Sequence, residues 1–507
     1  MCKIKEILRY DFRKYLDILI FITLINCGAL ILRSAFIYND GYWHIKCGEY
    51  IASNLKNITD IKCYGSWLIS DKAGLKTEWL FDLIIYYISK ISETSVCSFM
   101  VLLYYVTTLL TVKFITRGKR GYKSQRLFYN CIVNGIAIGA CALAQARPQQ
   151  FTMLFIVMFI YIIEFSLDNK KPNRLFLLIP ITLLWANIHG GTSMLAYAIL
   201  IVYIISNSID YTVGKIEFKK TSRKWRITAI IVLLLVFVAI CVNPSGIKLL
   251  FHAFSNMGDA RMVSSIVEWM PPDAKSLASL IQWYLPMIMG LIALIQYKDK
   301  INGKDILLWF MFIYLFARSQ RFCMFMLIVE VMIISKYGFT LYVSDKIPSD
   351  KISIQDTIAA WIFIIGNIVI MSMTFMNYIP ISQITDVTLP SEELVQEIKD
   401  TEPKRLYNTY NVGGYLFYNG IDVFVDGRYE PYRDTGIIDD YFILNSSNSE
   451  NYEIGTMKLQ EYNFDYVLIA IDDLTMYSRL YNNSNYKLIN RDEKYLYFKN
   501  LKYVSQE

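Results

Sequence analysis

Residues 227–243 read ITAIIVLLLVFVAICVN and contain no charged side chain. An apolar run of this kind, close to the roughly 20 residues that a helix needs to cross a bilayer, is typical of a membrane span. The composition of the chain agrees, because 54% of its 507 residues are hydrophobic, only 19% are charged and the mean hydropathy is +0.33. We therefore expect a polytopic α-helical membrane protein and not a soluble enzyme.

Ten further apolar segments accompany that run. The first follows the basic residues of the N-terminus and has no small-residue cleavage site after it, which predicts an uncleaved span. The 79–115 segment is too long for one helix, so we interpret Trp79–Lys90 as an amphipathic or re-entrant lead-in and Thr94–Ile115 as the crossing. About eleven spans result, and the segments after the first lie near 79–115, 127–145, 151–168, 175–188, 193–213, 227–243, 280–297, 305–317, 322–343 and 357–379.

The loops between these segments differ in positive charge. The segments expected inside hold 26 Lys and Arg, and those expected outside hold 11 in a longer total sequence. Cytoplasmic loops of membrane proteins carry the excess of Lys and Arg. The bias predicts a cytoplasmic N-terminus and, with an odd number of spans, an extracytoplasmic C-terminal part.

The chain changes character near residue 380. We expect a transmembrane domain over 1–379, with a first outer loop over 38–78, and a soluble domain over 380–507. In the second part, short β-like runs such as Tyr466–Ile471 alternate with helical patterns such as Glu392–Lys399. This alternation predicts a small extracytoplasmic α/β domain.

Charge and cysteine content exclude some classes of function. The net charge of +7 is spread over short loops, so we expect the lipid bilayer as a partner and no nucleic acid. The nine Cys form no CxxC pair and most lie in apolar segments, which indicates neither a zinc site nor a disulfide framework. Whether Cys47 and Cys63 form a bridge is left open.

The first outer loop concentrates polar and aromatic residues. Asp40 follows the first span directly, and His44 comes four residues later, on the same face if the segment is helical. Trp43 could stack on a sugar ring, and Asp40 at the membrane interface could act as a base. The alternative is a helix N-cap with an ordinary interfacial aromatic belt. Glu78 is either a second site acid or a charge that complements the helix dipole, and whether the two acids share a site is open.

Short outer turns carry the other candidate residues. Arg147 lies in a tight turn and could bind a phosphate, or else contact lipid headgroups. Asn187 and His189 precede paired glycines, which allow a ligand close to the backbone or simply make a helix turn. Glu268 adds an acid. Arg318 and Arg321 share a face if their turn stays helical, as an anion site or as snorkelling interfacial cations.

Several short motifs occur in an order that resembles a family of bacterial multi-pass membrane proteins related to the GT-C glycosyltransferases. Most of the chain is covered. The motifs are D-x-x-W-H-I-x-x-G-E-Y-I from Asp40, S-W from Ser66, E-W-L from Glu78, R-P-Q from Arg147, W-A-N-I-H-G-G from Trp185, N-P-S-G from Asn243, E-W-x-x-P-D from Glu268, G-G-Y-L from Gly413 and D-G-R from Asp426.

The resemblance implies a GT-C-like fold in the bacterial cell membrane and an inverting glycosyltransferase activity. A polyprenyl-phosphate-linked sugar would be the donor, and an envelope glycan, lipid or protein would be the acceptor. Asp40 matches the catalytic carboxylate. Arg147, Arg318 and Arg321 would stabilise the leaving lipid phosphate, while His189 and Glu78 would shape the sugar pocket.

No DxD pair is present, and no second-loop acid stands beside Arg147. No metal can therefore be assigned, although a divalent cation stays open as a cofactor. The alternative to an enzyme is a non-enzymatic multi-pass protein, either a glycan-binding or assembly subunit or a transporter. A transporter should have polar residues near the middle of the membrane.

Overall fold

The computed structural model describes residues 40–58, 65–69, 77–92, 95–112, 135–141, 147–251, 267–338, 389–432 and 435–503, with a few single positions. The contacts divide the chain into two units. Unit 1 comprises Met1–Ala35 and Cys97–Tyr378, and unit 2 comprises Phe36–Val96 and Ile379–Glu507. The sequence-based division assigned residues 38–78 to the transmembrane part, whereas in the structure they group with the C-terminal part.

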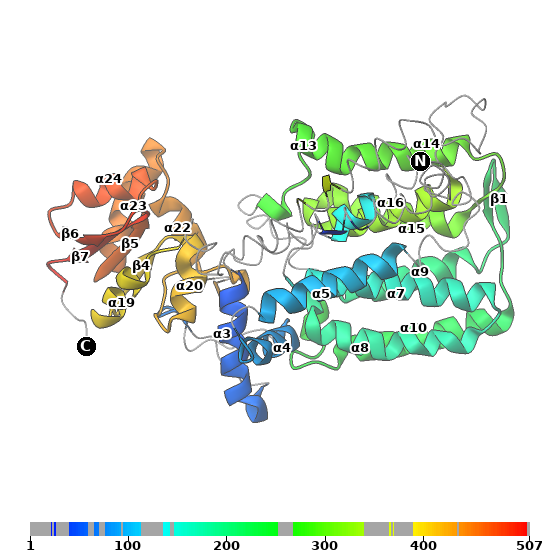
Figure 1. Ribbon diagram of the computed structural model, residues 1–507, viewed down its shortest axis with the longest axis horizontal. Helices are drawn as coiled ribbons and strands as arrows, with labels where there is room; N and C mark the ends of the chain where they lie inside the picture. Colours follow the sequence, from blue (N-terminus) through cyan, green and yellow to red (C-terminus); the bar gives the residue numbers. More distant parts are fainter. Residues whose placement is uncertain are drawn as a thin grey trace, which may run out of the picture. The chain divides into compact units, whose positions relative to one another are not determined.

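Unit 1 consists mainly of apolar helices. Figure 1 shows α7, α8 and α10 side by side. The indole Nε1 of Trp225 in α10 donates to Oγ of Ser166 in α7 at 2.8 Å and so links these two helices. The longer helices are α5 (Ser95–Leu110), α7 (Gln149–Asp168), α8 (Leu178–Ile188), α9 (Met194–Ser206), α10 (Arg223–Cys241), α14 (Leu285–Gln296), α15 (Gly303–Arg318) and α16 (Cys323–Tyr337).

Side-chain caps and short elements fix where these helices begin. Oγ of Ser222 accepts from the backbone N–H of Trp225 at the start of α10, and Oδ1 of Asn302 accepts from Lys304 at the start of α15. A small sheet of order β1-β2-β3 joins the α9–α10 connection to the α14–α15 connection. Its strands are β1 (Tyr211–Val213), β2 (Ile216–Phe218) and β3 (Ile301–Asn302), with β1 and β2 antiparallel and β2 and β3 parallel.

Three helical stretches among the described residues are long and apolar enough to cross a membrane: Gln149–Asp168, Arg223–Cys241 and Leu277–Gln296. Shorter apolar helices are Trp79–Ser89, Ser95–Leu110, Pro172–Ile188 and Gly190–Ser206. The chain is thus a mainly helical protein with helices that can span a membrane. The expected spans at 127–145 and 357–379 and the first span lie wholly or largely outside the described residues.

The 79–115 segment forms two helices, as its length predicted. The first, α4 (Trp79–Ser89), belongs to unit 2 and packs against α3 (Asp40–Ser53). The second, α5, begins at Ser95.

The C-terminal part of unit 2 contains a four-stranded sheet of order β4-β5-β7-β6. β4 and β5 are parallel, and the β5–β7 and β7–β6 pairs are antiparallel. The predicted small α/β fold is therefore present. Its strands are β4 (Leu406–Asn408), β5 (Tyr466–Ala470), β6 (Tyr486–Arg491) and β7 (Tyr495–Asn500), and its helices are α19 (Glu392–Asp400), α20 (Gly413–Tyr418), α21 (Tyr429–Tyr432), α22 (Ile437–Leu444), α23 (Ser449–Tyr462) and α24 (Leu474–Tyr481).

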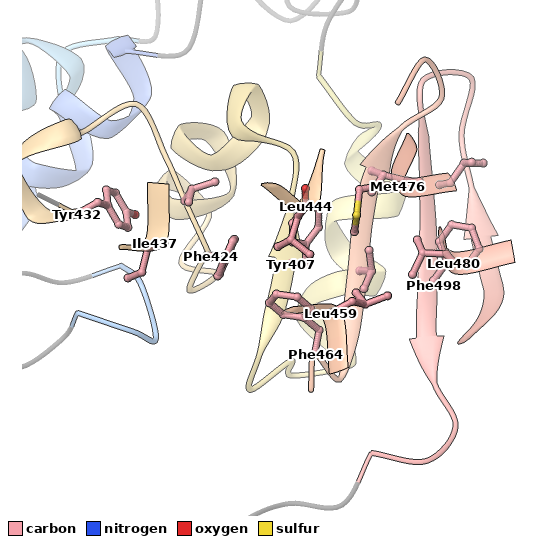
Figure 2. Close-up of a cluster of buried hydrophobic side chains, with 14 of the residues drawn as sticks. Tyr407, Phe424, Tyr432, Ile437, Leu444, Leu459, Phe464, Met476, Leu480 and Phe498 are labelled. Atoms are coloured by element: carbon pink, nitrogen blue, oxygen red, sulfur yellow. The ribbon is translucent and has the colours of Figure 1, made fainter. Parts of the chain in front are cut away.

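The core of unit 2 combines residues from the sheet and from the first loop. Figure 2 shows Tyr407, Phe424, Leu459, Phe464 and other apolar side chains of this cluster. Ile69 of the first loop is 1% exposed and belongs to the same cluster. Ser66 forms a parallel β-bridge with Val423, and Nε1 of Trp67 donates to the carbonyl of Leu406 at 3.1 Å. Residues 65–69 are therefore an integral part of the C-terminal fold.

Candidate functional site

Three of the predicted residues lie on one face of α3. Asp40 is its first residue, and Trp43 and His44 follow at i+3 and i+4, which are neighbouring positions on a helix. Nε1 of Trp43 donates to Oδ1 of Asp40 at 3.0 Å. The ring centroids of Trp43 and His44 are 3.7 Å apart, with an angle of 30° between the planes. Asp40 and His44 share a face only if this segment is helical, and the structure shows that it is.

Asp82 of α4 and Glu78, the residue just before this helix, complete the surroundings of His44. Its Nδ1 lies 2.5 Å from Oδ1 of Asp82, and its Nε2 lies 3.9 Å from Oε2 of Glu78. Gly48 allows this approach of α3 and α4, because a Cβ at this position would lie 2.1 Å from the carbonyl oxygen of Asp82. His44 is 2% exposed and Asp82 is also buried. We call Asp40, Trp43, His44, Glu78 and Asp82 the histidine cluster.

Opposing effects act on the pKa of His44. Burial lowers it, while the charges of Asp82, Glu78 and Asp40 and the hydrogen bond that Asp82 accepts raise it. The carboxylates prevail, so the pKa of His44 lies above its ordinary value of 6.5. Protonated His44 compensates part of the negative charge of the three acids, and the cluster can hold a proton between a buried imidazole and carboxylates.

The D-G-R motif brings a second part of the sequence to Asp40. A Cβ at Gly427 would lie 2.8 Å from Oδ1 of Asp40 and 3.2 Å from Nε1 of Trp43. The backbone at Gly427 therefore touches the Asp40–Trp43 hydrogen bond. Only glycine leaves both side chains where they are.

The residues beside Gly427 hold this backbone in place. Nη2 of Arg428 pairs with Oδ2 of Asp426 at 2.5 Å, and the hydroxyl of Tyr432 donates to the same oxygen at 3.0 Å. Nη1 of Arg428 lies 3.9 Å from Sγ of Cys47 in α3. Asp426 and Arg428 are both buried and pair with each other, so their role here is structural.

A different group of predicted residues gathers in unit 1. Nη1 of Arg147 donates to Oε1 of Glu268 at 2.6 Å. The guanidinium of Arg321 lies 5.0 Å from the ring centroid of Trp269. Burial raises the pKa of Glu268, but Arg147 and Arg321 outweigh burial, so this pKa is lower than usual. We call Arg147, Glu268, Trp269 and Arg321 the arginine cluster.

The turn between Arg318 and Arg321 does not stay helical, so the condition for a shared helical face is not met. α15 ends at Arg318, and Ser319 has an extended backbone with φ −156° and ψ 127°. A new short helix, η8 (Gln320–Phe322), starts after it. Oγ of Ser319 donates to the carbonyl of Glu268 at 3.1 Å, which fixes this break next to the arginine cluster.

His189 and Asn187 are both buried in unit 1. Nδ1 of His189 lies 2.7 Å from Oγ1 of Thr152, and this hydroxyl lies 2.8 Å from Oγ1 of Thr192. Nδ2 of Asn187 donates to the carbonyl of Val242 at 2.9 Å and so joins the end of α8 to the end of α10. His189 therefore belongs to a hydrogen-bond network with the hydroxyl groups of two threonines, and Asn187 links α8 to α10.

Sequence reasoning did not select two buried acids. Asp82 is the one charged residue of WLFDLIIYYIS, the sequence of α4, and it lies four positions after Glu78. Glu330 lies in the middle of α16 and is 0% exposed. In both cases the sequence shows an isolated acid inside an apolar helical stretch. Burial of such a group is energetically unfavourable unless it has a partner or a function.

The described residues include no group of three or more His, Cys, Asp or Glu side chains that could hold a metal ion. Cys63, the possible disulfide partner of Cys47, lies outside the described residues. The chain matches no protein-family model, and no curated protein matches it significantly.

Proposed function

We propose that this protein is a membrane-embedded inverting glycosyltransferase that moves a sugar from a polyprenyl-phosphate donor to a cell-envelope acceptor. The observation that carries the proposal is the histidine cluster, in which Asp40 hydrogen-bonds to Trp43 and acts on the charge of buried His44. A general base has to be held in a fixed orientation near other ionisable groups that set its protonation.

Asp40 is the proposed base. It takes the proton of the acceptor hydroxyl while that oxygen attacks the anomeric carbon, and the bond between this carbon and the phosphate oxygen breaks with its electron pair on the phosphate. The indole N–H of Trp43 orients the carboxylate, and Gly427 leaves space for it. His44, Glu78 and Asp82 act as positioning residues that set the local charge.

Arg147 and Arg321 are the cations proposed for the lipid phosphate. Arg147 is paired with Glu268, so a phosphate at this position has to displace that carboxylate. A bidentate Arg–phosphate contact is strong enough to compete with a partly exposed ion pair. Two nearby side-chain oxygens, Oε1 of Gln149 and of Gln150, are buried and have no hydrogen-bond partner within the described ranges. They suit the hydroxyl groups of a polar ligand.

The proposed topology has about eleven spans, a cytoplasmic N-terminus and unit 2 on the outer face, and the charge bias of the loops supports it. Leu501→Cys tests it, because Leu501 is 59% exposed. An impermeant thiol reagent should label this variant in intact cells, with the unsubstituted protein as control. Labelling only after lysis would contradict this orientation.

The activity is tested in a null strain that is complemented with wild type, Asp40→Asn or Asp472→Asn. Asp472 is an exposed acid of unit 2 outside the histidine cluster and serves as the matched control. Mass spectrometry of envelope glycans and polyprenyl-linked sugars should show a lost glycan and an accumulated donor in the null and Asp40→Asn strains only. A wild-type profile with Asp40→Asn at normal protein level would reject Asp40 as the base.

A transporter is the second candidate function. Ionisable residues in the interior of a helical bundle are typical of transport pathways. Glu330 is such a residue. Further charged residues are Lys336 on the same helix and Glu164, Lys304 and Asp305 on the helices packed against it. This reading predicts solute accumulation in vesicles that contain the purified protein, with no change in any lipid-linked sugar.

A further inference from the structure

Glu330 lies where three helices of unit 1 meet. It is the eighth of the fifteen residues of α16, and α16 packs against α14 and α15. All but one of the residues of α16 are buried, and Glu330 itself is 0% exposed. The carboxyl group is therefore removed from solvent in a mainly apolar environment.

Each oxygen of this carboxyl group has a distinct neighbour. Nε1 of Trp309 in α15 donates to Oε1 at 2.5 Å. Oε2 is buried and has no hydrogen-bond partner among the described residues. A Cβ at Gly290 in α14 would lie 2.0 Å from Oε2, so glycine makes room for this oxygen.

The nearest elements offer Glu330 no ion pair within the described part of the chain. α14 contains no ionisable side chain. Glu164 of α7 pairs with Lys304 of α15. Asp305 of α15 pairs with Lys336, which lies on α16 itself. The remaining ionisable groups of the elements packed against α16 and of α16 itself are Tyr161, Asp168, Tyr314, Arg318, Arg321, Cys323 and Tyr337.

A carboxylate in this position would keep a full charge with one neutral hydrogen-bond donor. Burial of an unpaired charge in an apolar medium costs far more than burial of the neutral acid, so such a group binds a proton instead. The indole N–H suits the carbonyl oxygen of a neutral acid, and Oε2 is then the oxygen that carries the proton.

We propose that Glu330, Trp309 and Gly290 form a proton-binding site inside the helical bundle. The proton is exchanged with water: the O–H bond at Oε2 breaks, water takes the proton, and the reverse step restores the acid. α14 is the element next to Oε2, and a π-helical turn, η7 (Leu280–Tyr284), precedes it. Such turns interrupt regular helices, frequently at functional sites. The site is independent of the proposed sugar transfer.

Infrared spectroscopy of the full-length protein in lipid vesicles tests the site. The wild-type minus Glu330→Gln difference spectrum should contain the C=O stretching band of a protonated carboxylic acid at neutral pH. The band should shift after transfer to D₂O, because the bound proton exchanges. Glu164→Gln is the matched control: this acid is paired with Lys304, so its difference spectrum should lack the acid band.

Trp309→Phe provides a second variant that keeps the acid. Loss of the indole donor should move the acid band to higher wavenumber, which a purely structural role of Trp309 would not do. Absence of an acid band in the wild type would overturn the proposal, since Glu330 would then be charged. A band that stays unchanged in D₂O would also overturn it, because the proton would then be a fixed part of the fold.

Discussion

Nδ1 of His44 and Oδ1 of Asp82 lie 2.5 Å apart, across the contact between α3 and α4. Both residues are buried, so the charge of each depends on the other. Trp43 covers one face of the imidazole, and Phe81 meets it edge-on at a centroid distance of 4.8 Å. The histidine cluster is thus a coupled group in which replacement of one acid changes the protonation of its neighbours.

Asp82→Asn should lower the pKa of His44. Burial is the largest single effect on this imidazole and acts downward, and Asp82 is the strongest of the carboxylates that oppose it. The chain has only three His, so NMR of histidine-labelled protein can follow each of them through a pH titration. His44→Gln assigns the resonance. An unchanged titration of His44 in Asp82→Asn would show that the contact has no electrostatic role.

The stability of the protein should depend on pH through His44. A histidine whose pKa is higher in the folded state stabilises the fold fully below its unfolded value of about 6.5, and this contribution disappears as the pH rises through the folded value. Thermal unfolding should therefore show a wild-type Tm that falls as the pH rises from about 6.5 through the folded pKa of His44. In His44→Gln the fall should be smaller, and an equal fall in both proteins would assign it to other groups.

Trp67→Ala should destabilise unit 2 by about 2 kcal/mol, less than the loss of a fully buried aromatic side chain, because Trp67 is partly buried and packs against the core cluster. Trp67 contacts Phe424, Tyr462 and Phe464 at centroid distances between 6.1 and 6.4 Å, and its indole donates to the carbonyl of Leu406. Limited proteolysis should cleave the 389–503 region faster in this variant. Lys502→Ala, at an exposed position, is the control and should keep the wild-type pattern.

Periodicity and composition predicted the elements better than their grouping. Apolar runs located helices such as α7 and α10, and alternating short patterns predicted the α/β character of the C-terminal part. The grouping of residues 65–69 with that part depends on one β-bridge, on the contacts of Trp67 and on the burial of Ile69. Contacts between residues more than 300 positions apart leave no periodic signal in one sequence.

The candidate site was predictable only where its residues are close in sequence. Helical spacing placed Asp40 and His44 on one face, because this relation is local. The proximity of Gly427 to Asp40 is a tertiary relation that spacing does not encode. The helix does not continue from Arg318 to Arg321, because Ser319 between them has an extended backbone. Its hydroxyl donates to the carbonyl of Glu268. A tertiary contact here overrides the local helical preference.

Removal of one partner of the Glu164–Lys304 ion pair should destabilise the protein strongly, whereas replacement of both partners by apolar residues should destabilise it little. Nζ of Lys304 lies 2.8 Å from Oε2 of Glu164, and both side chains are largely buried. Glu164→Ala leaves the ammonium group unpaired, so we expect a loss of about 3 kcal/mol or more. The double variant Glu164→Leu/Lys304→Met should recover most of the Tm, because it removes both charges. If the double variant is no more stable than Glu164→Ala, shape and not charge determines stability here.

The Arg147–Glu268 pair should contribute little to stability, because the side chain of Glu268 is 44% exposed and solvent screens the pair. A double-mutant cycle with Arg147→Gln and Glu268→Gln should give a coupling free energy of about 1 kcal/mol or less. The lowered pKa of Glu268 implies that this coupling is present above the unfolded value of about 4.5 and lost as the pH falls through the folded value.

Glu268→Gln should also tighten the binding of a short-chain prenyl phosphate, since Arg147 loses its competing carboxylate, whereas Arg147→Gln should weaken it. Equal binding by both variants would show that this pair only joins the two loops.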